Sequence, residues 1–166
     1  AGVASASVVV VVAASLEADG TLTDEAAALR PARQATADTP VYLGIRADLA
    51  ATSVTATAAG VTAHADAIAA AVQGQDADGV YLEYTGMTQA QSSWLVDVAT
   101  ELKIRLGESG VIIGVPAGDE GYPVATLLDA ADAVWVRAAA DPAEFHRTVG
   151  TLLSDGSVSD ASRVSL

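Results

Sequence analysis

Six short apolar runs recur along the chain, and polar or helix-forming segments separate them. Most of the runs are continuous and rich in β-branched residues, a pattern typical of strands buried on both faces of a parallel sheet. Their starts are roughly 20 to 40 residues apart, the spacing expected of repeated βα units. The six runs are Val8–Ala14, Val41–Ala47, Gly79–Tyr84, Val111–Ala117, Ala133–Ala138 and Arg163–Leu166.

The segments between the runs carry helix signals. Thr88–Leu106 places apolar residues at helical spacing and is followed by Gly107, a residue typical of helix C-caps. Asp141-Pro142-Ala143-Glu144 combines an Asp N-cap with Pro at the first helical position. Pro31 should distort a helix that opens at Thr23, unless that helix starts late. We predict helices over Thr23–Ala35, Ala50–Val72, Thr88–Leu106 and Tyr122–Ala131, and another from Asp141 onward.

Alternating strands and helices leave two main architectures, a (β/α) barrel and an open doubly wound sheet. Ala14-Ser15-Leu16-Glu17 follows the first run in place of a Gly-x-Gly-x-x-Gly loop, which weakens a dinucleotide-binding interpretation. About five βα units and a sixth strand fall short of the roughly 250 residues of a closed eight-fold barrel. We therefore predict an α/β fold, a parallel TIM-type barrel that is incomplete. Residues 1–166 then form one domain. Either this domain is a segment of a longer chain, or a partner chain completes the barrel.

Composition excludes several classes of function. The net charge of −13 makes a nucleic acid an unfavourable partner, because its phosphates repel the chain. The absence of cysteine excludes disulfides and thiolate metal sites. No apolar run approaches the ~18 residues of a membrane span. We expect no metal and no cofactor, and a location outside the cell or at its surface, although such a domain would also work in the cytoplasm.

The stretch Asp78–Thr85 reads DGVYLEYT. It resembles the signature strand of the chitinase-like glycoside hydrolases of family 18, Asp-Gly-x-Asp-x-Asp-x-Glu. The opening Asp-Gly pair matches. Tyr81 and Glu83 stand at the two internal aspartates, and Thr85 stands at the proton-donating glutamate.

The order of the other strands resembles the same family. Val41–Arg46 is similar to the strand before the signature, and Val111–Ala117 is similar to the strand after it. Ala131-Asp132 matches the approach to the sixth strand, but Val136–Ala139 holds neither the Met nor the Tyr that the family has there. The resemblance therefore implies the barrel scaffold along most of the chain.

The substituted positions bear on the chemistry that the resemblance implies. In the family, the final Glu protonates the leaving oxygen, and the N-acetyl group of the substrate acts as nucleophile. That group is oriented by the neighbouring Asp and by the Tyr after the sixth strand. Thr85 has no proton of suitable acidity to donate, Tyr81 cannot relay charge as a carboxylate does, and Ala138 and Ala139 cannot orient an acetamide. We expect the inherited reaction to be lost.

Other carboxylates follow the strands and could replace the missing pair. Glu83, Asp119 and Glu120 are the catalytic candidates, because two carboxyl groups at glycosidase spacing can act as acid and base. Glu17 and Asp48 also lie near strand ends. In a chain with 21 acidic residues, solvated loop acids are the favoured interpretation.

The position of Glu83 within its strand also predicts a basic partner for its charge. Tyr81 and Glu83 share one face of their strand, and Leu82 and Tyr84 share the other. If Glu83 faces the barrel interior, it requires a basic partner, since an unpaired buried charge is costly. The candidate ligand-binding residues are Arg46, Tyr81, Glu83, Tyr84, Tyr122 and Arg137.

Two tryptophans and two histidines have sequence positions that bear on binding. Trp135 lies near a strand end and could stack on a sugar, whereas Trp94 has the position of a residue that packs a helix on the sheet. His64 and His146 fall in predicted helices without the acidic neighbours of a metal site, so core or surface roles are expected.

Three functions remain open on the sequence. The first is a non-catalytic chitinase-like domain that binds glycan or serves as a structural module. The second is an active glycosidase that pairs Glu83 with Asp119 or Glu120. The third is a scaffolding domain of a larger surface assembly, whose incomplete barrel docks against another chain.

Overall fold

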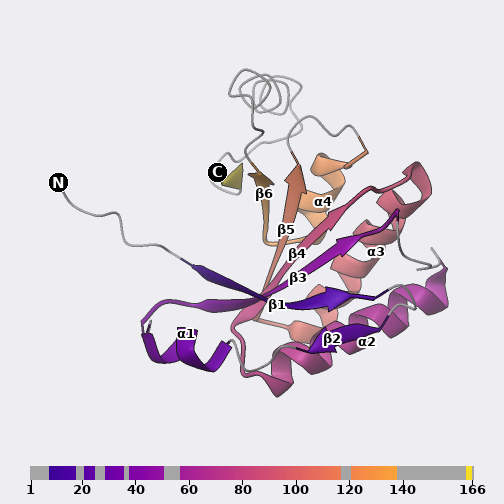
Figure 1. The fold of residues 1–166 in the computed structure, drawn as a ribbon. Coiled ribbons are helices and arrows are strands. Elements are labelled where there is room, and N and C mark those ends of the chain that lie inside the picture. Colours follow the sequence, from indigo (N-terminus) through magenta and orange to yellow (C-terminus); the bar gives the residue numbers. More distant parts are fainter. Residues whose placement is uncertain are drawn as a thin grey trace.

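The chain forms one mostly parallel sheet with helices packed on it (Figure 1). The described residues give seven strands in the order β2-β1-β3-β4-β5-β6-β7. The computed structural model describes residues 8–17, 21–24, 29–35, 38–50, 57–116, 121–137 and 164–165.

All neighbouring strands are parallel except β2, which pairs antiparallel with β1. The two ends of the strand order, β2 and β7, are not paired with each other, so the sheet is open and the barrel is incomplete, as predicted. The strands are β1 Val9–Leu16, β2 Leu22–Asp24, β3 Val41–Asp48, β4 Gly79–Thr85, β5 Gly110–Pro116, β6 Ala133–Arg137 and β7 Val164–Ser165.

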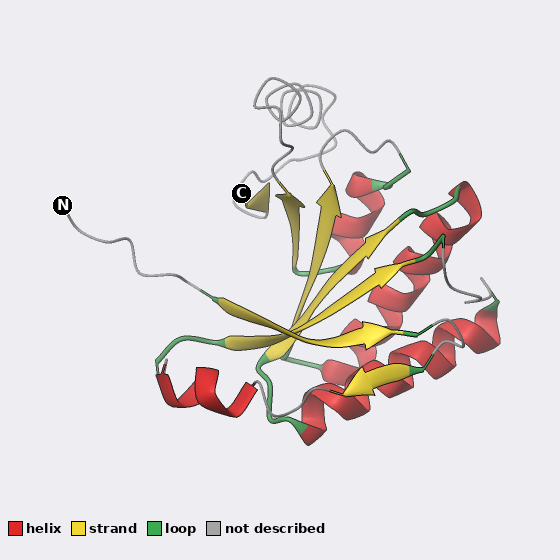
Figure 2. Cartoon of the chain, viewed as in Figure 1, coloured by secondary structure: helices red, strands yellow, loops and turns green. Residues whose placement is uncertain are grey.

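Three helices, α2, α3 and α4, cover one face of the sheet, and α1 lies beside the beginning of β1 and β3 (Figure 2). None of the described helices is long and apolar enough to cross a membrane. The helix predicted from Asp141 lies outside the described residues. The helices are α1 Leu29–Ala35, α2 Ala58–Gly74, α3 Gln89–Leu106 and α4 Val124–Ala130.

Two helix starts differ from the prediction. Thr23 belongs to strand β2, where its hydroxyl accepts from the Ser15 amide at 3.0 Å, so the helix of that region begins at Leu29. Pro31 then falls in the first turn, where its missing N–H is tolerated. The second helix was predicted from Ala50 but begins at Ala58, because the Thr57 hydroxyl accepts from the Gly60 amide and caps it.

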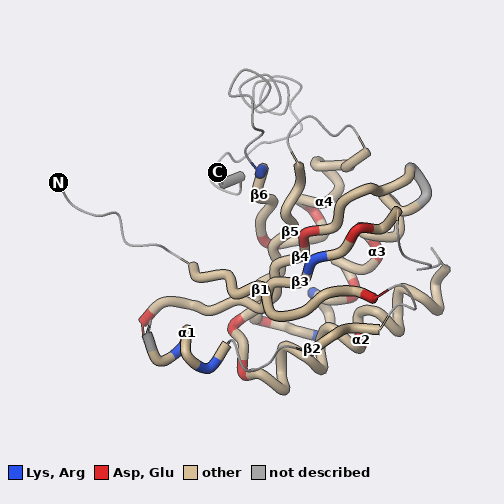
Figure 3. Tube along the Cα trace, in the orientation of Figure 1, with Lys and Arg blue, Asp and Glu red and all other residues tan. Residues whose placement is uncertain are grey.

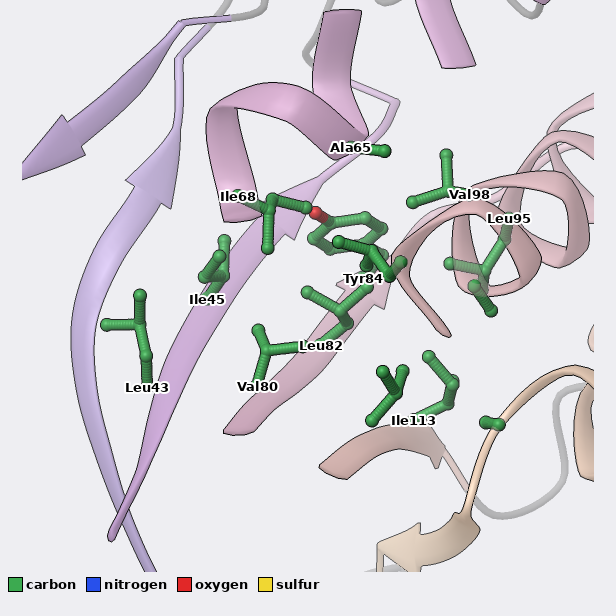
Figure 4. Close-up of a cluster of buried hydrophobic side chains, with 14 of the residues drawn as sticks. Leu43, Ile45, Ala65, Ile68, Val80, Leu82, Tyr84, Leu95, Val98 and Ile113 are labelled. Carbon is green, nitrogen blue, oxygen red and sulfur yellow. The ribbon is translucent and has the colours of Figure 1, made fainter. Parts of the chain in front are cut away.

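The core lies between the sheet and helices α2 to α4 (Figure 4). Val80, Leu82 and Tyr84 of β4 are at most 1% exposed and face these helices. Burying each aliphatic side chain of this kind contributes about 1.5–3 kcal/mol. Trp94 of α3 is 2% exposed and belongs to the same cluster, so its predicted packing role is confirmed.

Candidate ligand-binding site

The face of the sheet turned away from the helices carries a row of four residues in register. Arg46 of β3 pairs with Glu83 of β4, Glu83 with Gly114 of β5, and Gly114 with Trp135 of β6. Side chains alternate along a strand, so these residues point away from the core that holds Leu82. We call this surface the inner face, because it corresponds to the interior of a closed barrel.

Glu83 is the buried charge of the inner face, with 5% of its surface exposed. Arg137 Nη1 donates to its Oε1, and the Tyr81 hydroxyl donates to its Oε2 at 3.1 Å. Arg46 Nε lies 3.5 Å from Oε2. The predicted pairing of Glu83 with Arg46 or Arg137 is confirmed, and it involves both arginines. The pairing offsets the desolvation of the carboxylate, which would be costly alone.

Tyr81 fixes the position of that carboxylate from within the same strand. Its ring crosses β5 at Gly114, where a Cβ would collide with the Tyr81 hydroxyl. The ring also contacts Trp135, with centroids 5.6 Å apart and planes at 44°. Burial, reinforced by the charge of Glu83, raises the pKa of Tyr81 to about 12. The phenol therefore stays protonated and can donate to Glu83 at neutral pH.

The row ends in an open hollow at the carboxyl ends of the strands. Arg46 and Arg137 border this hollow, with side chains 57% and 49% exposed. Figure 3 shows basic and acidic positions interspersed at this end of the sheet. The polar residues that line the hollow are Ser15, Arg46, Asp48, Glu83, Thr85 and Arg137.

Thr85 takes the inner-face position two residues beyond Glu83. Its hydroxyl donates to the carbonyl oxygen of Ala47 at 3.3 Å, so it links β4 to β3. Asp48, in the same hollow, accepts the Ala50 amide at 3.1 Å through Oδ1. Among the described residues, no hydrogen bond or ion pair joins either Thr85 or Asp48 to Glu83. Asp119 and Glu120, the other catalytic candidates, lie outside the described residues, as do Ala138 and Ala139.

Two of the predicted ligand-binding residues lie elsewhere. Tyr84 faces the helices, is 1% exposed, and places its hydroxyl 2.6 Å from His64 Nε2. Tyr122 is 6% exposed, and its hydroxyl donates to the carbonyl oxygen of Tyr84. Both rings are enclosed by the core, so neither can stack on a sugar bound at the inner face.

Trp135 is predicted from its position near a strand end to be able to stack on a sugar, but it is not among the six candidate ligand-binding residues. It is half-buried on the inner face, next to Tyr81. The signal was present in the sequence, because Val134 and Val136 are the apolar neighbours expected to face the core. Across the described residues, no group of three His, Asp or Glu side chains could hold a metal ion.

Comparison with known protein families found no match, and neither did comparison with curated protein sequences. Solved structures do match. The spore cortex-lytic enzyme SleL of Bacillus megaterium matches with a TM-score of 0.77 at 9% identity, over 95% of this chain and 42% of that one. An immunomodulatory active chitinase of Trichuris suis matches with a TM-score of 0.75 at 14% identity, over 95% of this chain and 56% of that one.

A class V chitinase of Nicotiana tobaccum, solved in complex with NAG4, matches with a TM-score of 0.69 at 14% identity. That match covers 80% of this chain and 45% of the chitinase. The chain thus has a fold like that of the family 18 chitinases, as the signature strand indicated. It spans about half the length of these three structures.

Proposed function

We propose that this domain binds glycan without cleaving it. The observation that carries the proposal is the state of Glu83, whose two oxygens already accept from Arg137 and Tyr81 and lie beside Arg46. A general acid must deliver a proton to the leaving oxygen of the substrate. Glu83 is enclosed by donors, and Thr85 offers only a hydroxyl that is bonded to Ala47.

The glycan-binding half of the proposal rests on the aromatic pair beside that carboxylate. Tyr81 and Trp135 form a contiguous aromatic surface on the inner face, and Trp135 remains partly exposed. A sugar ring has an apolar face that can pack on such a surface, with polar groups nearby to fix its orientation. One structurally similar chitinase was solved with NAG4, which makes an N-acetylglucosamine oligomer the first ligand to test.

The test combines a hydrolysis assay with a binding assay. A fluorogenic N-acetylglucosamine oligomer should give no turnover, while the domain should be retained on insoluble glycan. Trp135→Ala should weaken retention, since it removes the exposed part of the aromatic surface. Ile104→Ala is the matched control, because Ile104 is 72% exposed on helix α3, on the opposite side of the sheet. Turnover by the unmodified domain would exclude the proposal.

An active glycosidase is the second candidate, and the sheet topology gives it one supporting observation. Asp119 and Glu120 follow β5, the strand that is in register with Glu83. If they complete a catalytic pair, Glu83→Gln and the double change Asp119→Asn with Glu120→Gln should each abolish turnover. Absence of turnover in the unmodified domain would remove this candidate.

A scaffolding role is the third candidate. It is supported by the open sheet that the described strands form. The molar mass in solution, measured by light scattering over a range of concentrations, tests self-association directly. A monomeric mass at all concentrations would count against assembly through copies of this chain.

A further inference from the structure

The inner face holds two guanidinium groups around one carboxylate. Arg137 uses Nη1 toward Glu83 Oε1, and Arg46 approaches Oε2 through Nε. A guanidinium carries five N–H donors in a planar fork, so most of the donors remain available. Neither arginine forms another ion pair or hydrogen bond with the described residues, and about half of each side chain is exposed. Two of the eight basic residues of a strongly acidic chain are thus directed into one hollow.

We propose that the glycan bound at this site is acidic and that Arg46 and Arg137 receive its carboxylate. The inference rests on the proposed glycan-binding function and narrows the substrate class. Arginine suits a carboxylate because its fork donates two parallel hydrogen bonds. The ion pairs with Glu83 orient both guanidinium groups before the ligand binds. This orientation lowers the entropic cost of binding.

The aromatic surface lies within reach of the same forks. Arg137 is two residues beyond Trp135 on β6, which places the two side chains on one face and about 7 Å apart along the strand. Glu83 is two strands from Trp135 in the same row, about 10 Å away at the usual strand spacing. A sugar stacked on Trp135 can therefore bring a carboxylate of its own, or of the next sugar, to Arg137.

Asp48 is an acidic residue that lines the same hollow, together with Glu83. Its Oδ1 accepts from the Ala50 amide, and a Cβ at Gly86 would lie 2.5 Å from that oxygen. The carboxylate is therefore engaged at the rim, between the segments that follow β3 and β4. It forms no ion pair with Arg46 or Arg137. The N–H donors of the two arginines that do not face Glu83 therefore remain open to an anionic ligand.

Three oligosaccharides of equal length test the inference by calorimetry at low salt. The first alternates glucuronate with N-acetylglucosamine, the second is its carboxyl-reduced form, and the third is the neutral N-acetylglucosamine tetramer. We expect the acidic oligosaccharide to bind at least about tenfold more tightly than its reduced form, in line with hydrogen bonds to charged groups. The advantage should shrink as salt is added.

Arg137→Gln and Arg46→Gln should each remove most of that advantage. Circular dichroism shows whether each variant folds. If one of the two fails to fold, the other still tests the inference. Arg105→Gln is the matched control, because Arg105 pairs with Asp66 and Glu101 across α2 and α3, on the far side of the sheet. Equal binding of the acidic and reduced oligosaccharides would overturn the inference and leave glycan binding intact. Binding of none of the three would overturn the proposed function as well.

Discussion

Asp78 and Asp132 form the same set of contacts two strands apart. Asp78 accepts the Val41 amide at 2.8 Å through Oδ2 and donates its own amide to the Val41 carbonyl at 2.9 Å. Asp132 does the same with Val111, at 2.7 Å and 2.9 Å. Each aspartate directly precedes a strand and ties it to the first residues of the neighbouring strand. The first aspartate of the signature is therefore a structural residue in this chain.

A basic residue on a helix completes each of these sets. Arg33 of α1 lies 3.0 Å from Asp78 Oδ1, and Lys103 of α3 pairs with Asp132 Oδ1. The helix, the strand and the neighbouring strand thus meet at one carboxylate in both places. The same arrangement therefore recurs in two successive parts of the sheet.

Asp78→Ala should destabilise the domain. The change leaves the Val41 amide without its acceptor and removes the ion pair to Arg33, with an expected loss of about 1–3 kcal/mol in the free energy of unfolding. The side chain is 40% exposed, so water will replace part of the interaction and the lower half of that range is expected. Urea unfolding measures the change.

Asp132→Ala should give a similar loss. The loss in the double variant should differ from the sum of the two single losses, because the charges of both aspartates act on Tyr42. Asp129→Ala, an exposed position on α4, is the matched control. The interpretation fails if Asp78→Ala unfolds at the same urea concentration as this control.

Acidification should weaken the fold through His64. Its ring is 4% exposed beside Tyr84 and Trp94, and burial lowers the pKa of His64 to about 4. Between pH 6.5 and 4 the unfolded chain binds a proton that the folded chain does not. The free energy of unfolding should therefore fall as the pH drops through this range, by about 3 kcal/mol in all.

Urea unfolding at pH 7, 5.5 and 4 isolates this contribution when the protein is compared with His64→Gln. The variant should lose less stability on acidification. His146→Gln serves as the control, since His146 is the other histidine of the chain. Parallel losses in the unmodified protein and His64→Gln would contradict the assignment.

The strands and the Glu83 ion pairs could be predicted because each follows from a local rule. Continuous apolar runs favour buried parallel strands, and alternation puts Tyr81 and Glu83 on one face. A buried carboxylate then requires a cation, and few basic residues were close enough in the predicted sheet. Arg46 and Arg137 both serve, because register brings β3 and β6 to either side of the Glu83 side chain.

The errors arose where tertiary contacts decide between local alternatives. Thr23-Asp24 is a good helix start on its own, but pairing with Ser15 makes it an edge strand. Tyr84 looked available to a ligand because it is aromatic and close to a strand end. The alternation that predicts Glu83 correctly also places Tyr84 in the core, and on β6 it places Trp135 on the inner face.

Gly114→Ala should disturb the site more than the fold. The new Cβ would collide with the Tyr81 hydroxyl, so the Tyr81 ring must move away from Glu83 and from Trp135. We expect a loss of about 1–3 kcal/mol in the free energy of unfolding and weaker glycan retention. Near-ultraviolet circular dichroism reports the change in aromatic packing.

Gly74→Ala is the control for this change, because a Cβ at Gly74, the last residue of α2, meets nothing within 4 Å. It should leave retention unchanged and should not lower the free energy of unfolding, because Ala is favoured over Gly in a helix by up to about 1 kcal/mol. If Gly114→Ala also leaves stability and retention unchanged, the position of the Tyr81 ring does not depend on the absence of a Cβ at Gly114.

Tyr81→Phe separates the hydrogen bond to Glu83 from the aromatic contact with Trp135. The ring remains, while the donor to Glu83 Oε2 disappears, so the free energy of unfolding should fall by about 1.5–3 kcal/mol, the range for hydrogen bonds to charged groups. Phenolate absorbance is measured in an alkaline titration of the unmodified protein and of Tyr81→Phe. The difference between the two titrations should have its midpoint near pH 12, in line with the raised pKa of Tyr81. A midpoint near pH 10 would show that Tyr81 is solvated and that Glu83 depends on the two arginines alone.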